Sequence, residues 1–288
     1  MVYDSIIIGA GPAGISASLY IKRSNLNVLV LYTNNSILSK AKQIDNYYGT
    51  PNISGEELYN IGIKQAKELG VELSNEEVLS VKIEMIEGNI GFKVATLKNE
   101  YLTKTVVVST GASRNTIKVA NILDYINTNV SYCATCDGFF YLGKDVAVLG
   151  NSEYALNEAK ELTKFAKSVT ILTNGNSFKL DVPDNIKVNK EKIISFKGTN
   201  KIEEIELEST TIQTSGIFIA WGVAGGFEFA KKVGVETKDN KIVVNSKMQT
   251  NVPGLYACGD VTGAPYQIFK AVYEGAVAGL DISECIKK

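Results

Sequence analysis

The chain has 288 residues, 45% of them hydrophobic and 21% charged, which is enough to bury one large core or two of ordinary size. A formal net charge of −1 gives no reason to expect nucleic acid or a membrane surface as a partner. The absence of histidine excludes serine–histidine hydrolysis and histidine-ligated zinc, and we expect no metal site. No stretch has the pattern of a signal peptide or the ~20 apolar residues of a membrane span, so we expect a cytoplasmic protein.

The N-terminal segment predicts a strand, a glycine turn, a helix and a second strand. Val2–Ile8 is a short run with β-branched residues, typical of a buried strand. Ala13–Arg23 has the apolar spacing of a helix, and Asn27–Tyr32 predicts the next strand. The glycine turn therefore stands in the place of a βαβ nucleotide-binding unit.

The turn itself has the glycine spacing of a dinucleotide loop, Gly-Ala-Gly-Pro-Ala-Gly. Gly9 allows a tight turn, Gly11 lets the backbone approach a pyrophosphate, and Gly14 permits close packing of helix on strand. The helix start offers free N–H groups and the positive end of the helix dipole to phosphates. The predicted dinucleotide-binding residues of this loop are Gly9, Gly11, Pro12, Ala13 and Gly14.

Cys133 and Cys136 are the one close pair among the four cysteines. Their spacing can close and reopen a small disulfide, and in a reducing compartment such a pair is more often catalytic or metal-binding than structural. A zinc site would need two more Cys or His ligands, and Cys258 and Cys285 do not form a second close pair. Asp137 follows directly, either as a proton donor to a leaving thiolate or as an ordinary turn residue.

A second strand–turn–helix–strand unit follows the cysteine pair. Val146–Leu149 predicts a strand, Gly150–Ala155 a turn, the residues through about Lys167 a helix, and Ser168–Thr173 another strand. The turn keeps its first glycine but has Ser152 where the second would stand. Two such units in one chain predict two nucleotide-type domains.

Two further strands frame the second unit. Val106–Gly111 ends in a Thr-Gly turn and Gly254–Asp260 ends in Gly-Asp, where a split first domain would be left and re-entered. We therefore expect an α/β fold of two Rossmann-like three-layer domains. The first is split into residues 1–114 and 244–288, and the second is inserted at residues 115–243.

Tyr132–Phe140, with the sequence Tyr-Cys-Ala-Thr-Cys-Asp-Gly-Phe-Phe, resembles the active-site signature of the low-molecular-weight thioredoxin reductases. The similarity covers almost the whole chain, including the Gly9 loop, Ile44–Asn46, Ser109–Ser113 and Thr250–Val261. The resemblance implies a homodimer whose subunits have an FAD domain and an NADPH domain. The second domain would carry a redox-active disulfide that passes electrons from the flavin to thioredoxin.

The same resemblance implies roles for individual residues. Asp260 matches the aspartate that holds the FAD ribityl chain, and Gln267 matches a glutamine at a helix start whose backbone faces the flavin ring. Cys136 would lie nearer the flavin, Cys133 would attack the thioredoxin disulfide, and Asp137 would donate a proton. The other FAD contacts expected beside the Gly9 loop are Ser39, Asn46, Thr110, Gly111 and Ile268.

Three elements that bind the nicotinamide cofactor in this family are altered. Ser152 replaces the second glycine, where a side chain would obstruct a pyrophosphate, and Tyr154 adds bulk. Thr173–Ser177 contains no cation, whereas the family has a His-Arg-Arg cluster that grips the 2′-phosphate. Gly222–Gly226 replaces the family's Gly-His-x-Pro segment.

The residues expected to bind FAD also depart from the family. Asn35–Ile37 replaces Gly-Gly-Gln after the second strand, and Tyr266 replaces the arginine before Gln267. The redox residues are kept while the nicotinamide residues are altered. This pattern resembles the ferredoxin-dependent, pyridine-nucleotide-independent flavin thioredoxin reductases.

We therefore expect an FAD-dependent thioredoxin-disulfide reductase that takes its electrons from reduced ferredoxin. The expected partners are thioredoxin, ferredoxin and a second copy of the chain. Two alternatives stay open: an NAD(P)H-dependent disulfide reductase with a modified nucleotide pocket, and a non-catalytic flavin or thiol redox sensor.

Overall fold

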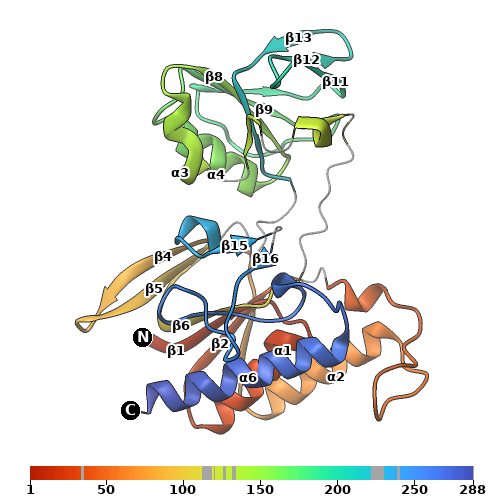
Figure 1. Cartoon of the computed structure of the whole chain (residues 1–288), viewed down its shortest axis with the longest axis vertical. Helices are drawn as coiled ribbons and strands as arrows, with labels where there is room; N and C mark the ends of the chain where they lie inside the picture. The colour runs from red at the N-terminus through yellow and green to blue at the C-terminus, as the bar shows by residue number, and fades with distance from the viewer. Residues whose placement is uncertain are drawn as a thin grey trace. The chain divides into compact units, whose positions relative to one another are not determined.

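The computed structural model describes residues 1–33, 36–111, 119, 121–125, 128–131, 134–221, 230–238 and 241–287. For Lys40, Leu123, Thr135 and Cys136 it describes the backbone alone. The chain forms two compact units, Met1–Ser113 with Gly225–Lys288 and Arg114–Ala224. Each unit combines a parallel sheet with helices, which confirms the expected α/β class (Figure 1). None of the described helices is long and apolar enough to cross a membrane.

The first unit is built on one large sheet. Its strands are β1 (Val2–Ile8), β2 (Val28–Tyr32), β3 (Glu72–Asn75), β4 (Val78–Ile86), β5 (Asn89–Thr96), β6 (Glu100–Val108) and β17 (Leu255–Ala257), beside the small pair β15 (Thr237–Lys238) and β16 (Lys241–Ile242). The order is β3-β2-β1-β6-β5-β4, and β17 pairs with β6. The strands β1, β2, β3, β6 and β17 run parallel, whereas β4 and β5 extend the sheet as an antiparallel hairpin.

The helices of this unit are α1 (Pro12–Arg23), α2 (Gly55–Glu68) and α6 (Ile268–Ile286), with the short 3₁₀ helices η1 (Leu38–Lys40) and η4 (Asp260–Thr262). α1 packs against β1 and β2 and contacts both α2 and α6 (Figure 1). α2 begins with a capping box, in which the Ser54 hydroxyl and the Glu57 carboxylate each bond the other residue's N–H. The predicted strand–turn–helix–strand order at the N-terminus is confirmed.

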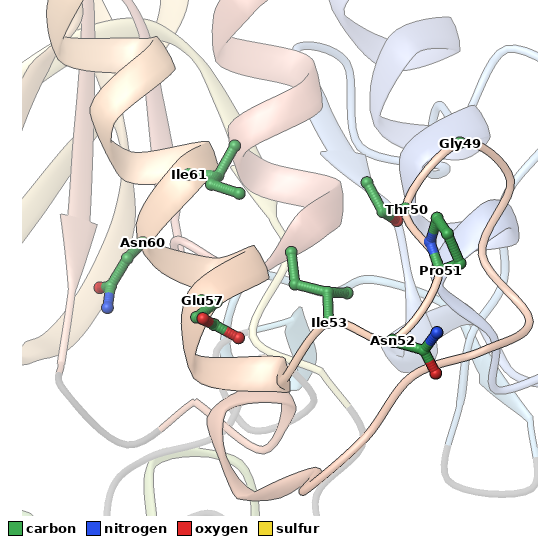
Figure 2. A pocket seen from close by; sticks show the side chains of 8 residues that line it. All are labelled: Gly49, Thr50, Pro51, Asn52, Ile53, Glu57, Asn60 and Ile61. Carbon is green, nitrogen blue, oxygen red and sulfur yellow. The ribbon is translucent and has the colours of Figure 1, made fainter.

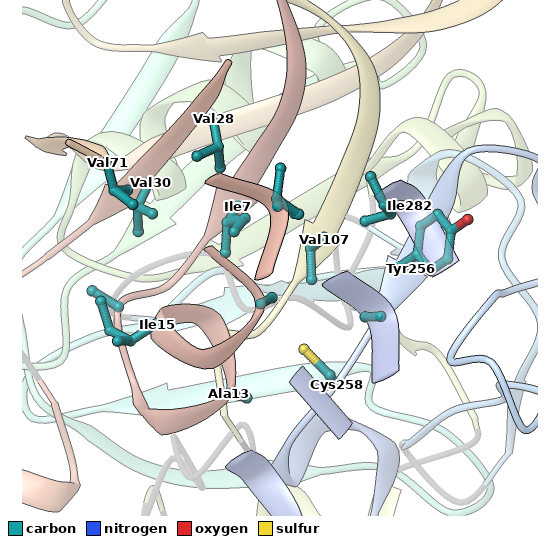
Figure 3. Packing of buried hydrophobic residues seen from close by; sticks show 14 of the residues in the cluster. Ile7, Ala13, Ile15, Val28, Val30, Val71, Val107, Tyr256, Cys258 and Ile282 are labelled. Atoms are coloured by element: carbon teal, nitrogen blue, oxygen red, sulfur yellow. The ribbon is translucent and has the colours of Figure 1, made fainter. Parts of the chain in front are cut away.

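The core of the first unit lies between the sheet and these helices (Figure 3). Ile7, Val30 and Val107 contribute from three neighbouring strands, and Ile282 contributes from α6. Cys258 is fully buried in the same cluster. The apolar contacts therefore fix the strand ends that carry the predicted cofactor residues.

The second unit contains a parallel sheet and a small antiparallel one. Its elements are η2 (Ile122–Tyr125), β7 (Val130–Ser131), α3 (Ala134–Asp137), η3 (Gly138–Tyr141), β8 (Asp145–Leu149), α4 (Glu153–Leu162), β9 (Ser168–Leu172), β10 (Ile186–Asn189), β11 (Ile193–Lys197), β12 (Glu204–Leu207), β13 (Thr211–Gln213) and β14 (Gly216–Ile219). The parallel sheet has the order β10-β9-β8-β14-β7, and β11-β12-β13 form the antiparallel one.

Helix α4 ends at Leu162, earlier than the end near Lys167 that the sequence suggests. The backbone beyond the helix bonds to another segment. The carbonyl oxygen of Phe165 accepts from the Gly143 N–H at 2.9 Å, and the N–H of Lys167 donates to Lys144 at 2.9 Å. These bonds to the turn before β8 replace the helical ones.

The chain also returns to the first unit earlier than residue 244. The second unit ends at Ala224, so β15 and β16 belong to the first unit. The N–H of Glu236 donates to Asn251 Oδ1 at 2.8 Å, and Asn251 Nδ2 donates to the Gly234 carbonyl at 3.0 Å. Because Asn251 lies in the segment that leads into β17, these bonds tie the returning segment to the split sheet before the predicted boundary.

Candidate active site

The turn between β1 and α1 is packed tightly against the end of β6. Gly9 has a φ of 110°, and a Cβ there would lie 2.5 Å from the Ser109 carbonyl oxygen. A Cβ at Gly14 would lie 2.5 Å from Ser109 Oγ and would collide with the Gly9 carbonyl. Both positions therefore require glycine, because the chain approaches itself too closely for a side chain.

Gly11 faces open space instead. It is the N-cap of α1, and no atom of the described residues lies within 4 Å of the position that its Cβ would take. Pro12 has no N–H, so the first turn presents the N–H groups of Ala13 and Gly14. An open cradle lined by backbone at a helix N-terminus fits the pyrophosphate of a dinucleotide.

Several predicted cofactor residues gather at the carboxyl ends of three parallel strands. Ile8 of β1 and Ala257 of β17 both pair with Val108 of β6, so the segments that follow begin side by side. These segments are the Gly9 loop, Thr110 with Gly111, and the turn that begins at Gly259. The carboxyl edge of a parallel sheet is where open α/β folds bind their ligands.

The turn after β17 is held by a buried ion pair that sequence reasoning missed. Asp260 opens η4, and Gly259 precedes it with a φ of 82°. Lys270 Nζ and Glu274 Oε2 lie 3.1 Å apart on α6, with side chains 10% and 11% exposed. A Lys–Glu pair four residues apart is ordinary on a helix surface, so the spacing alone does not reveal its burial.

Asn46 and Gln267, far apart in the sequence, meet at the start of α6. Asn46 Nδ2 donates to Gln267 Oε1 at 3.2 Å. Gln267 is the N-cap of α6 and Ile268 is its first residue, the position that the resemblance implies. Ser39 instead bonds within its own turn, where its hydroxyl donates to the Ser36 carbonyl at 2.7 Å.

The dithiol segment belongs to the second unit. Cys133 lies outside the described residues, and Cys136 is described by its backbone in α3. Asp137 Oδ2 accepts from the Ser131 hydroxyl at 2.7 Å, which fixes the carboxylate at the end of α3. Burial, and then the charge of Asp137, raise the pKa of Tyr141. The carboxylate is therefore positioned by a hydrogen bond rather than free to rotate.

A second carboxylate, which sequence reasoning also missed, reaches this segment. Glu158 is 2% exposed on α4, and its Oε2 accepts from the backbone N–H of Ala134 at 2.7 Å. Its neighbours Ala155 and Ala159 are fully buried on the same helix. A charged residue at a helix position whose spacing predicts burial is the signal that could have identified it.

The second nucleotide-type turn, between β8 and α4, differs from the first in what stands at the helix start. Gly150 still packs closely, since a Cβ there would lie 2.7 Å from the Ala155 Cβ. The N-cap is Ser152, the first helical residue is Glu153, and Tyr154 is 3% exposed. Glu153 is the one acidic residue in the first turn of α4, whereas the first turn of α1 has none.

The loop after β9, where the family's phosphate-binding cations would stand, bonds to itself and to its neighbours. The Thr173 hydroxyl donates to the Asn176 carbonyl at 2.7 Å, and Asn176 Nδ2 donates to Thr173 and Asn174 carbonyls at 2.9 and 3.1 Å. Asn174 Oδ1 accepts from the Ile193 N–H at 2.9 Å. The altered segment Gly222–Gly226 and the residue Asn35 lie outside the described residues.

A surface hollow of about 570 Å³ lies in the first unit, between the loop around Pro51 and the start of α2 (Figure 2). Its lining consists of Gly49, Thr50, Pro51, Asn52, Ile53, Glu57, Asn60 and Ile61. None of these was predicted to bind a cofactor. Its lining shares no residue with the cradle at Gly11.

Comparisons with known proteins agree with this geometry. The family model described as pyridine nucleotide-disulphide oxidoreductase matches residues 3–275. A thioredoxin reductase from Bacillus subtilis (strain 168) is 30% identical, over 100% of this chain and 96% of its own. The solved structure of an atypical thioredoxin reductase from Desulfovibrio vulgaris Hildenborough is similar, with a TM-score of 0.88, 35% identity, and coverage of 99% of this chain and 98% of that one. A ferredoxin-flavin thioredoxin reductase from Clostridium acetobutylicum is similar with a TM-score of 0.70, 31% identity, and coverage of 99% and 98%.

Proposed function

This chain belongs to the pyridine nucleotide-disulphide oxidoreductases and, within them, to the thioredoxin reductases, which bind FAD, and we propose that reduced ferredoxin is its electron donor. The proposed reaction is reduction of a thioredoxin disulfide by the Cys133–Cys136 dithiol. The proposed working form is a homodimer in the reducing cytoplasm. In this proposal, the first unit binds FAD and the second unit carries the Cys133–Cys136 dithiol.

The residues of the first unit fit FAD. The open cradle at Gly11 and the N–H groups of Ala13 and Gly14 would receive its pyrophosphate. Asp260, at the start of η4, would hold the ribityl chain, and Gln267, at the start of α6, would face the flavin ring. FAD, when bound, supplies the capacity to collect electrons one at a time and to deliver them as a pair.

In the dithiol segment, two electrons and two protons convert the Cys133–Cys136 disulfide into two thiols. The Cys133 thiolate then attacks the thioredoxin disulfide, which forms a mixed disulfide and releases one thioredoxin thiol. The Cys136 thiolate displaces the second thioredoxin sulfur and closes the Cys133–Cys136 disulfide again. Asp137, held by the Ser131 hydroxyl, would donate the proton that a leaving thiolate needs.

The choice of ferredoxin as the electron donor rests on a difference between the N-termini of α1 and α4. Gly11 and Pro12 begin α1, whereas Ser152 and Glu153 take the same places at α4. A side chain at Ser152 stands where the space at Gly11 is open. Glu153 adds negative charge where a dinucleotide would bring its pyrophosphate. Similarity to the ferredoxin-flavin thioredoxin reductase of Clostridium acetobutylicum supports the same choice.

The energetics permit this route. Thioredoxin has a reduction potential of about −270 mV. Ferredoxins of the plant type lie near about −400 mV, which is negative enough to drive the transfer. A conventional nicotinamide donor is not required for the reaction to proceed.

An anaerobic absorbance titration of the FAD-loaded protein tests the donor. Excess NADPH, then NADH, then photoreduced ferredoxin would be added, with thioredoxin thiols measured after each. We expect only ferredoxin to bleach the flavin and to support many turnovers. Prompt bleaching by NADPH would contradict the donor proposal, and ferredoxin-driven bleaching without thioredoxin turnover would favour the redox sensor.

A matched variant sharpens this test. Ser152→Gly with Glu153→Pro copies the residues of the first helix start onto the second. If these two residues exclude the nucleotide, the double variant gains NADPH binding that the natural protein lacks. If neither protein binds NADPH, the exclusion comes from elsewhere in the second unit.

One observation favours an NAD(P)H-dependent reductase as the second candidate. The Gly175 N–H donates to the Lys190 carbonyl at 3.1 Å, and a Cβ at Gly175 would lie 4.0 Å from the Lys192 Cβ. The fold therefore brings two lysines beside the loop that lacks cations of its own. If NADPH bleaches the flavin, Lys190→Met with Lys192→Met should weaken its binding more than that of NADH, because only NADPH carries a 2′-phosphate.

A further inference from the structure

The buried ion pair of α6 directs its hydrogen bonds at a single turn. The Lys270 ammonium donates to the Gly259 carbonyl at 2.9 Å, and the Gly259 N–H donates to Glu274 Oε2 at 2.8 Å. The Thr262 hydroxyl oxygen lies 2.8 Å from Lys270 Nζ and 2.9 Å from Glu274 Oε2. The Lys270–Glu274 pair therefore holds the N–H and the carbonyl of Gly259, and also the Thr262 hydroxyl at the other end of the same turn.

A buried ion pair is a costly way to stabilise a fold. Removing two charges from water costs several kcal/mol per ion, and apolar residues of similar size often serve a fold as well or better. The pair is 10% and 11% exposed and sits beside Cys258, whose thiol pKa is raised by burial and by the charge of Glu274. Burial of these two charges therefore costs folding free energy, which points to a role for the pair besides stabilising the fold.

The turn that it holds is the one that carries Asp260. Gly259 has a φ of 82°, and a Cβ there would lie 2.9 Å from the Ala13 Cβ of the first loop. The amide and carbonyl of Gly259 set the direction in which the chain leaves β17, and Asp260 is the next residue. A small rotation of this turn would move Asp260 relative to the cradle at Gly11.

We propose that Lys270 and Glu274 are positioning residues for FAD, which lock the Gly259–Thr262 turn in the shape that presents Asp260 to the cofactor. The inference rests on the role given to Asp260 in the proposed function. It predicts that FAD affinity depends on a charge pair that does not itself touch FAD.

The chain supplies a matched control on the same helix. Asp281 accepts from Lys247 Nζ at 2.8 Å and from the Tyr256 hydroxyl at 2.9 Å, and its side chain is 4% exposed. The ion pair ties α6 to the segment before β17, and the Tyr256 bond ties it to β17 itself, without a bond to Gly259 or Thr262 among the described contacts. Its loss should affect stability in general but not the turn.

The experiment measures FAD dissociation constants for the full-length apoprotein by flavin fluorescence, together with apoprotein melting temperatures. Lys270→Met leaves Glu274 buried without its partner and should weaken FAD binding by about ten-fold or more, since bonds to charged groups are lost. Lys247→Met should lower the melting temperature but keep the FAD affinity within about two-fold of the natural protein.

A double variant keeps the proposal testable if Lys270→Met does not fold. Lys270→Met with Glu274→Leu replaces the pair with apolar side chains, which should restore the apoprotein's stability. We expect FAD affinity to stay weak in this variant, because the bonds to Gly259 are still missing. Natural FAD affinity in the double variant would overturn the proposal, since it would assign the pair to stability alone.

Asp260→Ala separates this inference from the function on which it rests. If Asp260→Ala leaves FAD affinity unchanged, the role of Asp260 in the proposed function is wrong. If Asp260→Ala weakens binding while the pair variants do not, the role of Asp260 stands and the positioning role of Lys270 and Glu274 is wrong.

Discussion

Glu158 Oε2 accepts a hydrogen bond from the backbone N–H of Ala134, over an N···O distance of 2.7 Å. Glu158 is buried on α4, whereas Ala134 opens α3 and directly follows Cys133 in the sequence. A helix start normally favours a thiolate, because its N–H groups and dipole stabilise negative charge. A buried carboxylate at this N–H acts in the opposite direction and favours the disulfide.

Glu158→Gln keeps an acceptor for the Ala134 N–H but removes the negative charge. We expect the midpoint potential of the Cys133–Cys136 couple to become less negative by roughly 30 mV, which is a ten-fold change in the thiol–disulfide equilibrium. Titration in glutathione buffers with thiol alkylation measures this shift. Glu161→Gln, on the same helix and paired with Lys164, is the control and should leave the potential unchanged. A more negative potential in Glu158→Gln would contradict the argument.

Cys133→Ser should abolish thioredoxin reduction, with a loss of at least about 10³-fold, because the attacking sulfur is absent. The flavin should remain reducible by the proposed donor, since the variant does not alter the first unit, where we propose that FAD binds. Anaerobic flavin absorbance and a thioredoxin thiol assay measure the two effects separately. Cys285→Ser, at an exposed cysteine of α6, should retain full activity. Continued turnover by Cys133→Ser would disprove its role as the nucleophile.

Gly11→Ser tests the open cradle, because it places at α1 the residue that stands at the start of α4. The new side chain would occupy the empty space beside the first-turn N–H groups, and we expect FAD affinity to fall by about ten-fold or more. Gly62→Ala is the matched control: its Cβ would meet Ile15 Cγ2 at an ordinary 3.5 Å. Flavin fluorescence quantifies both affinities, and equal affinities would rule out the cradle as the pyrophosphate site.

Glu76 links stability to pH in the first unit. Burial opposes its ionisation, but hydrogen bonds from Thr96, Ser74, Tyr101 and Asn99 outweigh burial and lower its pKa from 4.5 to about 2. Because the folded-state pKa is depressed, the stability that it contributes is present above pH 4.5 and is lost as the pH falls toward 2. Glu76→Gln should therefore flatten the acid limb of the stability profile, in which the free energy of unfolding falls as the pH falls.

Chemical denaturation between pH 6 and pH 2.5 would measure this limb. Thr96→Val removes the closest donor, whose hydroxyl lies 2.5 Å from Glu76 Oε2, and should flatten the same limb in part. An acid limb that is as steep in Glu76→Gln as in the natural protein would show that other carboxylates set it.

The sequence predicts features that depend on local pattern. The roles of Gly9 and Gly14 in a tight turn, and the place of Gln267 at a helix start, follow from glycine spacing and from resemblance, and the geometry agrees with both. Glu158 and Lys270 were missed because their importance comes from burial against segments distant in sequence. Local pattern does not reveal which charged residue of a helix will be enclosed.

The inserted topology has a consequence for how the protein is made. The Gly9 loop is synthesised before the second unit, whereas β17, η4 and α6, from Leu255–Ile286, are synthesised after it. Domains generally fold as units while the chain emerges from the ribosome, so the second unit can be complete while the first still lacks strand β17. The proposed FAD pocket is therefore completed only after the second unit, and a nascent chain stalled before Leu255 would have a folded second unit without a complete pocket for FAD.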